Sequence, residues 1–270
     1  MGDILLGKSV DYDAPYDPGL LSPIARAAGR DVLAIGSALP FGGCDIWNAY
    51  ELSWLDSSGK PQVAIGEFRF PAMSPNIVES KSFKLYLNSL NQHRFAEVSD
   101  VALTMQRDLA VCVGAPVEIL LHLPQQWSRL QTVAPRGHCL DAIAVAIDTY
   151  TPAPELLTIN SQKHVSQSWF SRLLRSRCPV TGQPDWGTVQ IEYRGAEIDP
   201  AGLLAYIVSF REHQDFHEHC VERMFVDIMQ RCAPQQLTVY ARYLRRGGLD
   251  INPYRSTELQ VPANARFARQ

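Results

Sequence analysis

The sequence predicts an α+β fold in which two halves of the chain repeat the order strand, strand, helix, helix, strand. Alternating apolar and polar residues predict half-buried strands, and apolar residues three and four apart predict amphipathic helices. Both patterns occur in the same order twice along the 270 residues, although sequence identity between the halves is too weak to prove a duplication. With 46% hydrophobic residues, the chain can bury a sizeable core.

The first half contains five expected elements. In order, they are the strands Trp47–Leu55 and Gln62–Phe70, the helices Ser80–Leu90 and Asp100–Val113, and a strand over Val117–Leu123. The turn residues Ser57-Ser58-Gly59 separate the two strands. Ser99 is expected to cap the second helix, and Gly114 is expected to end it, because these residue types favour helix termini.

The second half repeats this order. Its expected elements are strands over Ser168–Leu174 and Thr188–Arg194, two helices, and a last strand over Leu237–Tyr243. Asp199 and Pro200 are a typical N-cap and first-turn pair for the first of these helices. The second helix presents one apolar face, made of Val221, Met224, Phe225, Ile228 and Met229. The segment Gln125–Glu155, interrupted by proline and glycine, connects the halves.

Composition and charge exclude several classes of protein. The formal net charge of -3 leaves no basic footprint of the kind that nonspecific nucleic-acid binding requires. The longest apolar runs, such as Leu203–Phe210, are far shorter than the ~20 residues that span a bilayer. Met1–Val10 contains Asp3 and lacks the basic and apolar regions of a signal peptide. We therefore expect a cytoplasmic protein with no direct contact to nucleic acid or membrane.

Among the six cysteines, Cys178 has the setting of a nucleophile. The cysteines form no C-x-x-C pair, which argues against a disulfide scaffold. Cys178 lies in a stretch broken by proline and glycine, beside Arg175 and Arg177, and Asp185 follows seven residues later as a potential proton donor. A free thiol with a pKa near ~8.5 needs roughly 2 kcal/mol of stabilisation to become nucleophilic at neutral pH. Alternatively, Cys178 fills the core and Asp185 caps a turn.

Glu79 lies at the start of the helix predicted from Ser80. A carboxylate there is stabilised by the helix dipole by about 0.3–1 kcal/mol, while Ser80 can cap the helix. A fixed carboxylate can accept two parallel N–H bonds from a planar ligand, and Lys81 and Lys84 are available to an anion. The alternative is an ordinary charged helix start.

Three histidines crowd into a short stretch with acidic residues and a cysteine. His213 and His217 are four apart and could share a helical face, as zinc ligands often do, with Cys178 joining from a distance. Neither H-E-x-x-H nor a close cysteine pair is present. Metal binding, structural capping and substrate contact all stay open for the segment His213–Cys220.

The arginines near the C-terminus resemble a phosphate site. Arg242, Arg245 and Arg246 precede Gly247-Gly248, where a close backbone approach could combine with bidentate pairing of guanidinium groups to phosphate. The alternative is a solvated strand end followed by a turn. No G-x-G-x-x-G or G-x-x-x-x-G-K-[ST] motif occurs, so neither a Rossmann nor a P-loop nucleotide site is supported.

Taken together, four segments resemble the QueF family of NADPH-dependent 7-cyano-7-deazaguanine reductases in its long, two-module form. They read VESKSFKLY over 78–86, RCPVTGQPDW over 177–186, FHEHC over 216–220 and RRGGLDINP over 245–253. The resemblance covers most of the chain in the family's order. It implies tandem tunnelling-fold (T-fold) modules over residues 1–140 and 141–270, each with an antiparallel sheet and helices on one face, in a homodimer.

The resemblance also implies a reaction, the reduction of a nitrile to a primary amine with two NADPH, in the pathway to the queuosine of tRNA. The Cys178 thiolate would attack the nitrile carbon to form a covalent thioimide, and Asp185 would donate a proton to the nitrogen. Because such an acid must hold its proton at neutral pH, we expect a partly desolvated site around Asp185.

Substrate and cofactor contacts follow from the same resemblance. Glu79 and Glu218 would bind the N–H groups of a guanine-like base, and Val78, Ser80 and His217 would complete the pocket. The implied NADPH contacts are Ser80, Lys81, Arg246 and Gly247, so residues of both halves are expected to meet in one cleft. No metal is implied.

Two alternatives from other functional classes remain. One is a zinc-dependent cyclohydrolase on the same fold, with Cys178 and the 213–220 segment as ligands. The other is a non-catalytic deazapurine-binding or thiol-redox protein.

Overall fold

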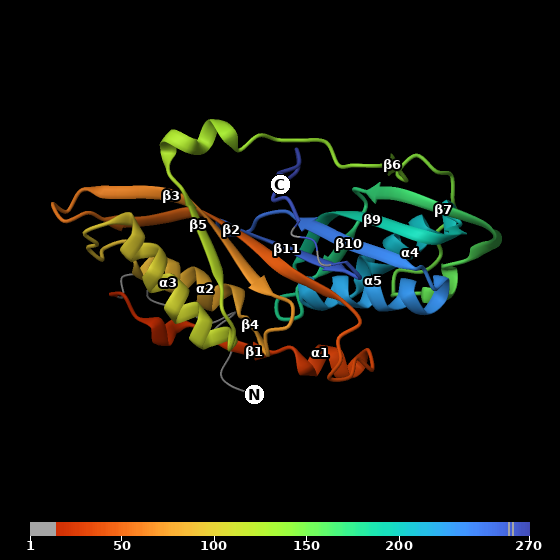
Figure 1. Cartoon of the computed structure of the whole chain (residues 1–270), viewed down its shortest axis with the longest axis horizontal. Coiled ribbons are helices and arrows are strands. Elements are labelled where there is room, and N and C mark those ends of the chain that lie inside the picture. The colour runs from red at the N-terminus through yellow and green to blue at the C-terminus, as the bar shows by residue number, and fades with distance from the viewer. Residues whose placement is uncertain (1–14, 259, 261) are drawn as a thin grey trace. The chain divides into compact units, whose positions relative to one another are not determined.

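The computed structural model describes residues 15–258, 260 and 262–270, which form two compact units (Figure 1). Unit 1 comprises described residues of 1–28, 45–131 and 245–250, and unit 2 comprises those of 29–44, 132–244 and 251–270. The prediction made for Met1–Val10 lies outside the described residues. The mixture of helices with mostly antiparallel strands confirms the α+β prediction. No helix of the described part is long and apolar enough to cross a membrane.

Unit 1 contains the five elements that the first half predicts. They are β2 (Gly42–Leu55), β3 (Pro61–Pro71), α2 (Ser80–Ser89), α3 (Val98–Val113) and β5 (Glu118–His122). Two short strands were not among the predicted elements: β1 (Pro23–Ala25) lies before β2, and β4 (Asn76–Val78) lies between β3 and α2. Strand β3 lies between β2 and β5, and α2 and α3 cover one side of these strands (Figure 1). The short β4 pairs antiparallel with β1, and it ends at Val78, directly before the Glu79 segment.

The ends of α3 test two capping predictions. The prediction of Ser99 as N-cap is wrong, because α3 begins at Val98 and Glu97 is the N-cap. Asp100 takes the capping role, accepting a hydrogen bond from the Glu97 N–H at 3.2 Å. Gly114 ends the helix as predicted, with a φ of 73° that favours glycine.

Unit 2 is a five-stranded sheet with two long helices. Its elements are α1 (Ala27–Val32), β6 (His138–Cys139), β7 (Ile159–Ser171), β8 (Arg175–Arg177), β9 (Pro184–Ile198), α4 (Pro200–Ser209), α5 (His217–Cys232), β10 (Gln236–Tyr243) and β11 (Leu249–Ser256). The strand order is β11-β10-β9-β7-β6, with β8 paired to β9 outside this path. Asp199 caps α4 as predicted, accepting from the Gly202 N–H at 2.8 Å.

Two strands of unit 2 differ from their predicted bounds, and the strands β6, β8 and β11 were not predicted. Strand β7 begins nine residues before Ser168 and ends at Ser171 rather than Leu174. The prediction missed its first part, INSQKHVSQ, because this mostly exposed segment lacks apolar alternation. Strand β9 begins at Pro184, so Asp185 lies on a strand. Strand β11 was missed because buried Asp250, Asn252 and Arg255 break the apolar pattern.

The two units repeat one buried contact between their helices. In unit 1 the Tyr86 hydroxyl of α2 donates to Asp108 of α3 at 2.7 Å, and in unit 2 the Tyr206 hydroxyl of α4 donates to Asp227 of α5 at 2.6 Å. Each tyrosine is seventh in a 10-residue helix, and each aspartate is eleventh in a 16-residue helix. This correspondence supports the repeat that sequence identity alone left unproven.

Candidate functional site

Cys178 and Asp185 lie at the end of a short β-hairpin in unit 2. Strand β8 pairs antiparallel with the start of β9, with Ser176 opposite Asp185. Two backbone hydrogen bonds close the turn, from the Cys178 N–H to Gln183 O at 2.9 Å and from the Gly182 N–H to Cys178 O at 3.0 Å. The seven-residue spacing is therefore the spacing of a hairpin, whose turn begins at Cys178 and whose second strand carries Asp185.

Both side chains are withdrawn from water. Cys178 is 7% exposed and Asp185 is 5% exposed, which agrees with the partly desolvated site expected around the acid. Asp185 Oδ2 lies 3.3 Å from Nε2 of His217, the first residue of α5, whose side chain is 11% exposed. The hairpin and the N-terminus of α5 thus bring Cys178, Asp185 and His217 into one region of unit 2.

The arginines beside Cys178 pair with an acidic residue. Arg175 Nη1 lies 3.1 Å from Glu212, and the Arg177 guanidinium contacts the same carboxylate. The Arg175 guanidinium also lies over the Trp186 ring, at 5.5 Å from its centroid. Glu212 therefore offsets much of the positive charge that the sequence sets beside the thiol.

The histidine cluster centres on Asp215. His219 Nδ1 lies 3.0 Å from Asp215 Oδ1, and His213 Nε2 lies 3.7 Å from Oδ2. Burial raises the pKa of the Asp215 carboxyl, but the histidines outweigh it and hold that pKa below its usual value. Burial lowers the pKa of His219, yet the hydrogen bond and charge of Asp215 raise it overall. The cluster is thus an internal charge pair at the start of α5.

The expected shared helical face of His213 and His217 is wrong, because His213 precedes α5. Glu218 lies in the first turn of α5, beside His217, and is 2% exposed. Among the described residues, no group of three or more His, Cys, Asp or Glu side chains is arranged to hold a metal ion.

The Glu79 segment lies in unit 1, where Glu79 itself caps α2. Its carboxylate accepts hydrogen bonds from the backbone N–H groups of Lys81 at 2.9 Å and Ser82 at 2.7 Å. Ser80, expected as a possible cap, is the first helical residue instead. Glu79 and Val78 are buried, and each Glu79 oxygen accepts one backbone hydrogen bond.

The Gly247-Gly248 turn is also in unit 1. Arg246 and Leu249 bridge it, and both glycines have positive φ, 56° and 75°, as in the tightest hairpin turns. A Cβ on Gly247 would lie 3.2 Å from Lys84 Cε, so the glycine lets the lysine lie against the backbone. A cavity of about 280 Å³ at this turn is lined by Lys84, Glu51 and the two glycines, among others.

Arg242 does not belong to this turn. It is buried in unit 2, where it donates to the Tyr240 hydroxyl at 2.7 Å and to Asn264 at 2.9 Å. The prediction that Arg242 joins a phosphate site is therefore wrong.

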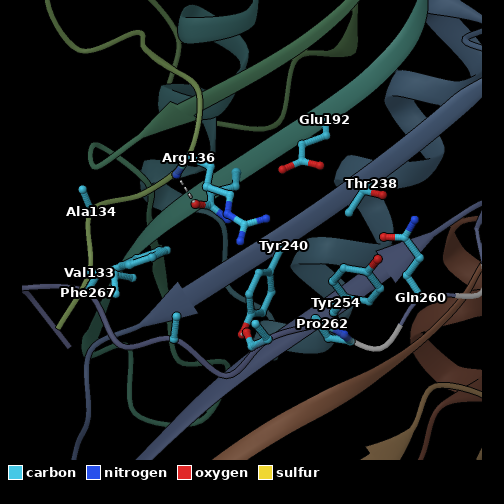
Figure 2. Close-up of a pocket in the computed structure, with 13 residues that line it drawn as sticks. Val133, Ala134, Arg136, Glu192, Thr238, Tyr240, Tyr254, Gln260, Pro262 and Phe267 are labelled. Atoms are coloured by element: carbon cyan, nitrogen blue, oxygen red, sulfur yellow. Dashed lines mark hydrogen bonds between the residues drawn. The ribbon is translucent and has the colours of Figure 1, made fainter. Parts of the chain in front are cut away.

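A cavity of about 410 Å³ lies in a different part of unit 2 (Figure 2). Tyr240 and Tyr254 form part of its wall, and Arg136 and Glu192 reach into it from either side. None of the predicted site residues lines this cavity.

The sequence reasoning missed one residue of the site. Tyr243 was considered only as a strand residue, but its ring stacks on the His217 imidazole with centroids 3.8 Å apart and planes 4° apart. Its position as the last residue of a buried strand, where functional side chains are often presented, was the available indication.

Comparisons with known proteins agree with the resemblance seen in the sequence. The family described as nitrile reductase, 7-cyano-7-deazaguanine-reductase N-term matches residues 12–121, and the family described as QueF-like protein matches residues 184–261. Among solved structures, the apo archaeosine synthase QueF-Like is similar with 20% identity and a TM-score of 0.31, covering 39% of this chain and 100% of that chain. So low a score carries no argument.

Full-length relatives share one name, NADPH-dependent 7-cyano-7-deazaguanine reductase. The protein of Bordetella pertussis is 57% identical over 266 residues, covering 98% of this chain and 97% of its own. Those of Burkholderia ambifaria and Chromobacterium violaceum are 55% and 52% identical over 267 residues, covering 98% of this chain and 97% and 96% of their own. Because these relatives match at more than half of all positions over nearly their whole length, the chain belongs to the family of NADPH-dependent 7-cyano-7-deazaguanine reductases.

Proposed function

We propose that this NADPH-dependent oxidoreductase reduces the nitrile of 7-cyano-7-deazaguanine to the primary amine of 7-aminomethyl-7-deazaguanine through a covalent thioimide on Cys178. The observation that carries the covalent route is the hairpin, which holds a buried thiol and a buried carboxyl at the ends of two paired strands, with His217 at 3.3 Å from that carboxyl.

Cys178 is the nucleophile of this proposal. Its thiolate attacks the nitrile carbon, forming a C–S bond while one π bond of the nitrile breaks and the nitrogen takes a proton. The thioimide is a better hydride acceptor than the nitrile. After its carbon is reduced, the C–S bond breaks and returns its electron pair to sulfur, leaving an imine that is reduced to the amine. The sum is one nitrile, two NADPH and two protons giving one amine and two NADP⁺.

Asp185 is the proton donor to the nitrogen in this scheme. The residue is 5% exposed, which is the partly desolvated setting expected for this role. His217, with Nε2 at 3.3 Å, can hold the carboxyl in place and exchange a proton with it between the two reductions.

Substrate recognition is assigned to Glu79 and Glu218, with His217, Val78 and Ser80 around them. The Glu79 carboxylate is already fixed by two backbone N–H groups, so accepting N–H bonds from a guanine-like base would cost little further side-chain entropy. Each charge-assisted bond contributes about 1.5–3 kcal/mol, which is enough to reject a base whose donors are placed differently.

The turn at Gly247 fits a phosphate of the cofactor. A Cβ on Gly247 would lie 3.2 Å from Lys84 Cε, and the adjoining cavity of about 280 Å³ is lined by Lys84 as well as by Glu51. We propose that Ser80, Lys81, Arg246 and Gly247 hold NADPH and that their positive charges favour it over NADH. NADPH supplies the hydride of each reduction when it is bound.

The remaining parts of the proposal concern organisation. We propose T-fold modules over residues 1–140 and 141–270, assembly as a homodimer, and a cytoplasmic role in queuosine biosynthesis without direct contact to tRNA or membrane. The Tyr86–Asp108 and Tyr206–Asp227 contacts support the tandem repeat.

An adduct experiment tests the covalent route. Mixing the protein with the nitrile in the absence of NADPH is expected to add one substrate mass, measured by intact-protein mass spectrometry. Cys178→Ala should form no adduct, whereas Cys139→Ala, which removes an exposed thiol, should form it fully. An adduct on the Cys178→Ala protein would show that the nucleophile is another group. Absence of nitrile-dependent NADPH oxidation by the wild type would reject the reductase function itself.

A further inference from the structure

Tyr243 lies directly on the imidazole of His217. The ring centroids are 3.8 Å apart and the planes differ by 4°, so the two rings overlap face to face. His217 Nε2 is the atom that lies 3.3 Å from Asp185. Two different residues therefore contact the imidazole: Tyr243 lies against its face, and Asp185 lies at its Nε2 edge.

The imidazole plane needs such support. The outer torsion of a histidine is broad and has no steep intrinsic preference. His217 Nδ1 is buried and has no hydrogen-bond partner among the residues that the structure describes. Nδ1 therefore provides no hydrogen bond that would hold the ring, and the Tyr243 stack opposes its rotation away from Asp185.

The backbone of unit 2 makes room for this stack. Tyr243 ends β10 and pairs with Gly187 of β9, two residues after Asp185. A Cβ on residue 187 would lie 3.2 Å from Tyr243 Cδ1 and 3.3 Å from both Arg242 O and Leu174 Cδ2, so a larger residue would crowd the ring and its surroundings. The Tyr243 N–H is also anchored by Asn252 Oδ1 at 3.2 Å. Strand register thus sets where the ring lies.

The ring, rather than the hydroxyl, faces His217. The hydroxyl is buried near Ser176 and Cys220, and burial, the Cys220 thiol and Asp185 together raise its pKa well above the usual value. The stacking geometry therefore assigns the contact with His217 to the ring and not to the hydroxyl.

We propose that Tyr243 is a positioning residue for nitrile reduction, whose ring holds the His217 imidazole in the plane that directs Nε2 at Asp185. This inference rests on the proposed acid role of Asp185. It also gives a reason for glycine at position 187, since a Cβ there would crowd the Tyr243 ring.

A double-mutant cycle tests the proposal. Tyr243→Leu removes the ring and is expected to lower kcat at least about tenfold while leaving the KM for NADPH unchanged. A positioned acid–base group contributes about 10²–10⁴-fold to the rate, and loss of its positioning should remove part of that contribution. Tyr243→Phe keeps the ring and should stay within about threefold of wild type. In a His217→Ala background, Tyr243→Leu should change kcat less than about twofold, because its effect passes through the imidazole.

Matched controls separate positioning from stability. Tyr193→Leu removes a buried ring from the same sheet, and the Tyr193 hydroxyl donates to Gln167. This variant should keep a kcat near wild type when it is assayed below its own melting temperature. Gly187→Ala presses on the ring without removing it, and it should also lose its effect on kcat when His217 is alanine. Equal losses from Tyr243→Leu with and without His217 would overturn the proposal.

A spectroscopic readout does not depend on turnover. Long-range proton–nitrogen NMR of His217 should show shifted ring nitrogens in Tyr243→Leu and Gly187→Ala and unchanged ones in Tyr243→Phe and Tyr193→Leu. An unchanged His217 in Tyr243→Leu would refute the positioning role even if the wild type reduced no nitrile. An inactive wild type with the expected NMR shifts would instead refute the proposed function and leave the ring contact established.

Discussion

Replacing Glu222 by glutamine is expected to destabilise unit 2 by about 3–5 kcal/mol. Glu222 lies on α5, five residues after His217, and is fully buried. It accepts from Arg30 Nε and Nη2 at 3.0 and 2.7 Å, and from Arg255 Nε and Nη2 at 3.1 and 2.8 Å. One carboxylate thus holds two buried guanidinium groups against the helix that presents His217.

The magnitude follows from the charges left behind. At an effective dielectric constant near 20, one contact pair at about 4 Å is worth ~4 kcal/mol before desolvation is counted. Desolvation offsets much of this gain in the wild type, but the variant keeps the desolvated arginines and loses their counter-charge. Both guanidinium groups also lie over the Phe41 ring, at 5.7 and 5.4 Å from its centroid. This cation–π contact compensates only a small part of the lost attraction to Glu222.

The assay is urea unfolding followed by circular dichroism, with Glu197→Gln as the control. Glu197 pairs with Lys163 at 2.6 Å, but the Lys163 side chain is 58% exposed, so this change should cost less than about 1 kcal/mol. The expected result is a clearly lower midpoint for Glu222→Gln only. Indistinguishable midpoints for the two variants would refute the reasoning that the buried charges depend on Glu222.

Three further predictions follow from the site and its surroundings. Asp185→Asn should keep the thiol adduct and NADPH binding while slowing turnover by about 10²-fold or more, and wild-type turnover would remove the acid role. Asp215→Asn should lose stability most between about pH 4 and 6.5, where the Asp215–His219 pair is charged. Because the folded pKa of Asp215 is lowered, the stability that the pair contributes is lost as pH falls below the ordinary 3.8. Because the folded pKa of His219 is raised, that stability is also lost as pH rises past the ordinary 6.5. Melting temperatures across pH measure this, and a flat difference would contradict it. Chelation should leave NADPH-dependent nitrile reduction intact, whereas loss of stoichiometric zinc together with activity would favour the cyclohydrolase alternative.

Local patterns were sufficient for the helices α2, α3, α4 and α5 and for the strands β2, β3, β5, β9 and β10, whereas α1 and the short strands β1, β4, β6 and β8 were not predicted. The bounds of α2, α3, α4 and β10 follow from apolar periodicity and from residues such as Asp199 and Gly114, whose effects act within one turn of the backbone. The first part of β7 was beyond this reasoning, because an exposed polar strand is defined by the pairing of its backbone with β9.

The candidate site divides in the same way. The sequence by itself determined the family, and it predicted the Cys178–Asp185 pair and the carboxylates Glu79 and Glu218, because these are carried by residue identity along short segments. Only the tertiary structure decided that Asp185 meets His217, that Glu212 pairs with Arg175 and Arg177, and that Tyr243 stacks on the imidazole. These contacts join residues 26 to 37 positions apart, and their distances depend on strand register and helix docking, which a linear pattern does not encode.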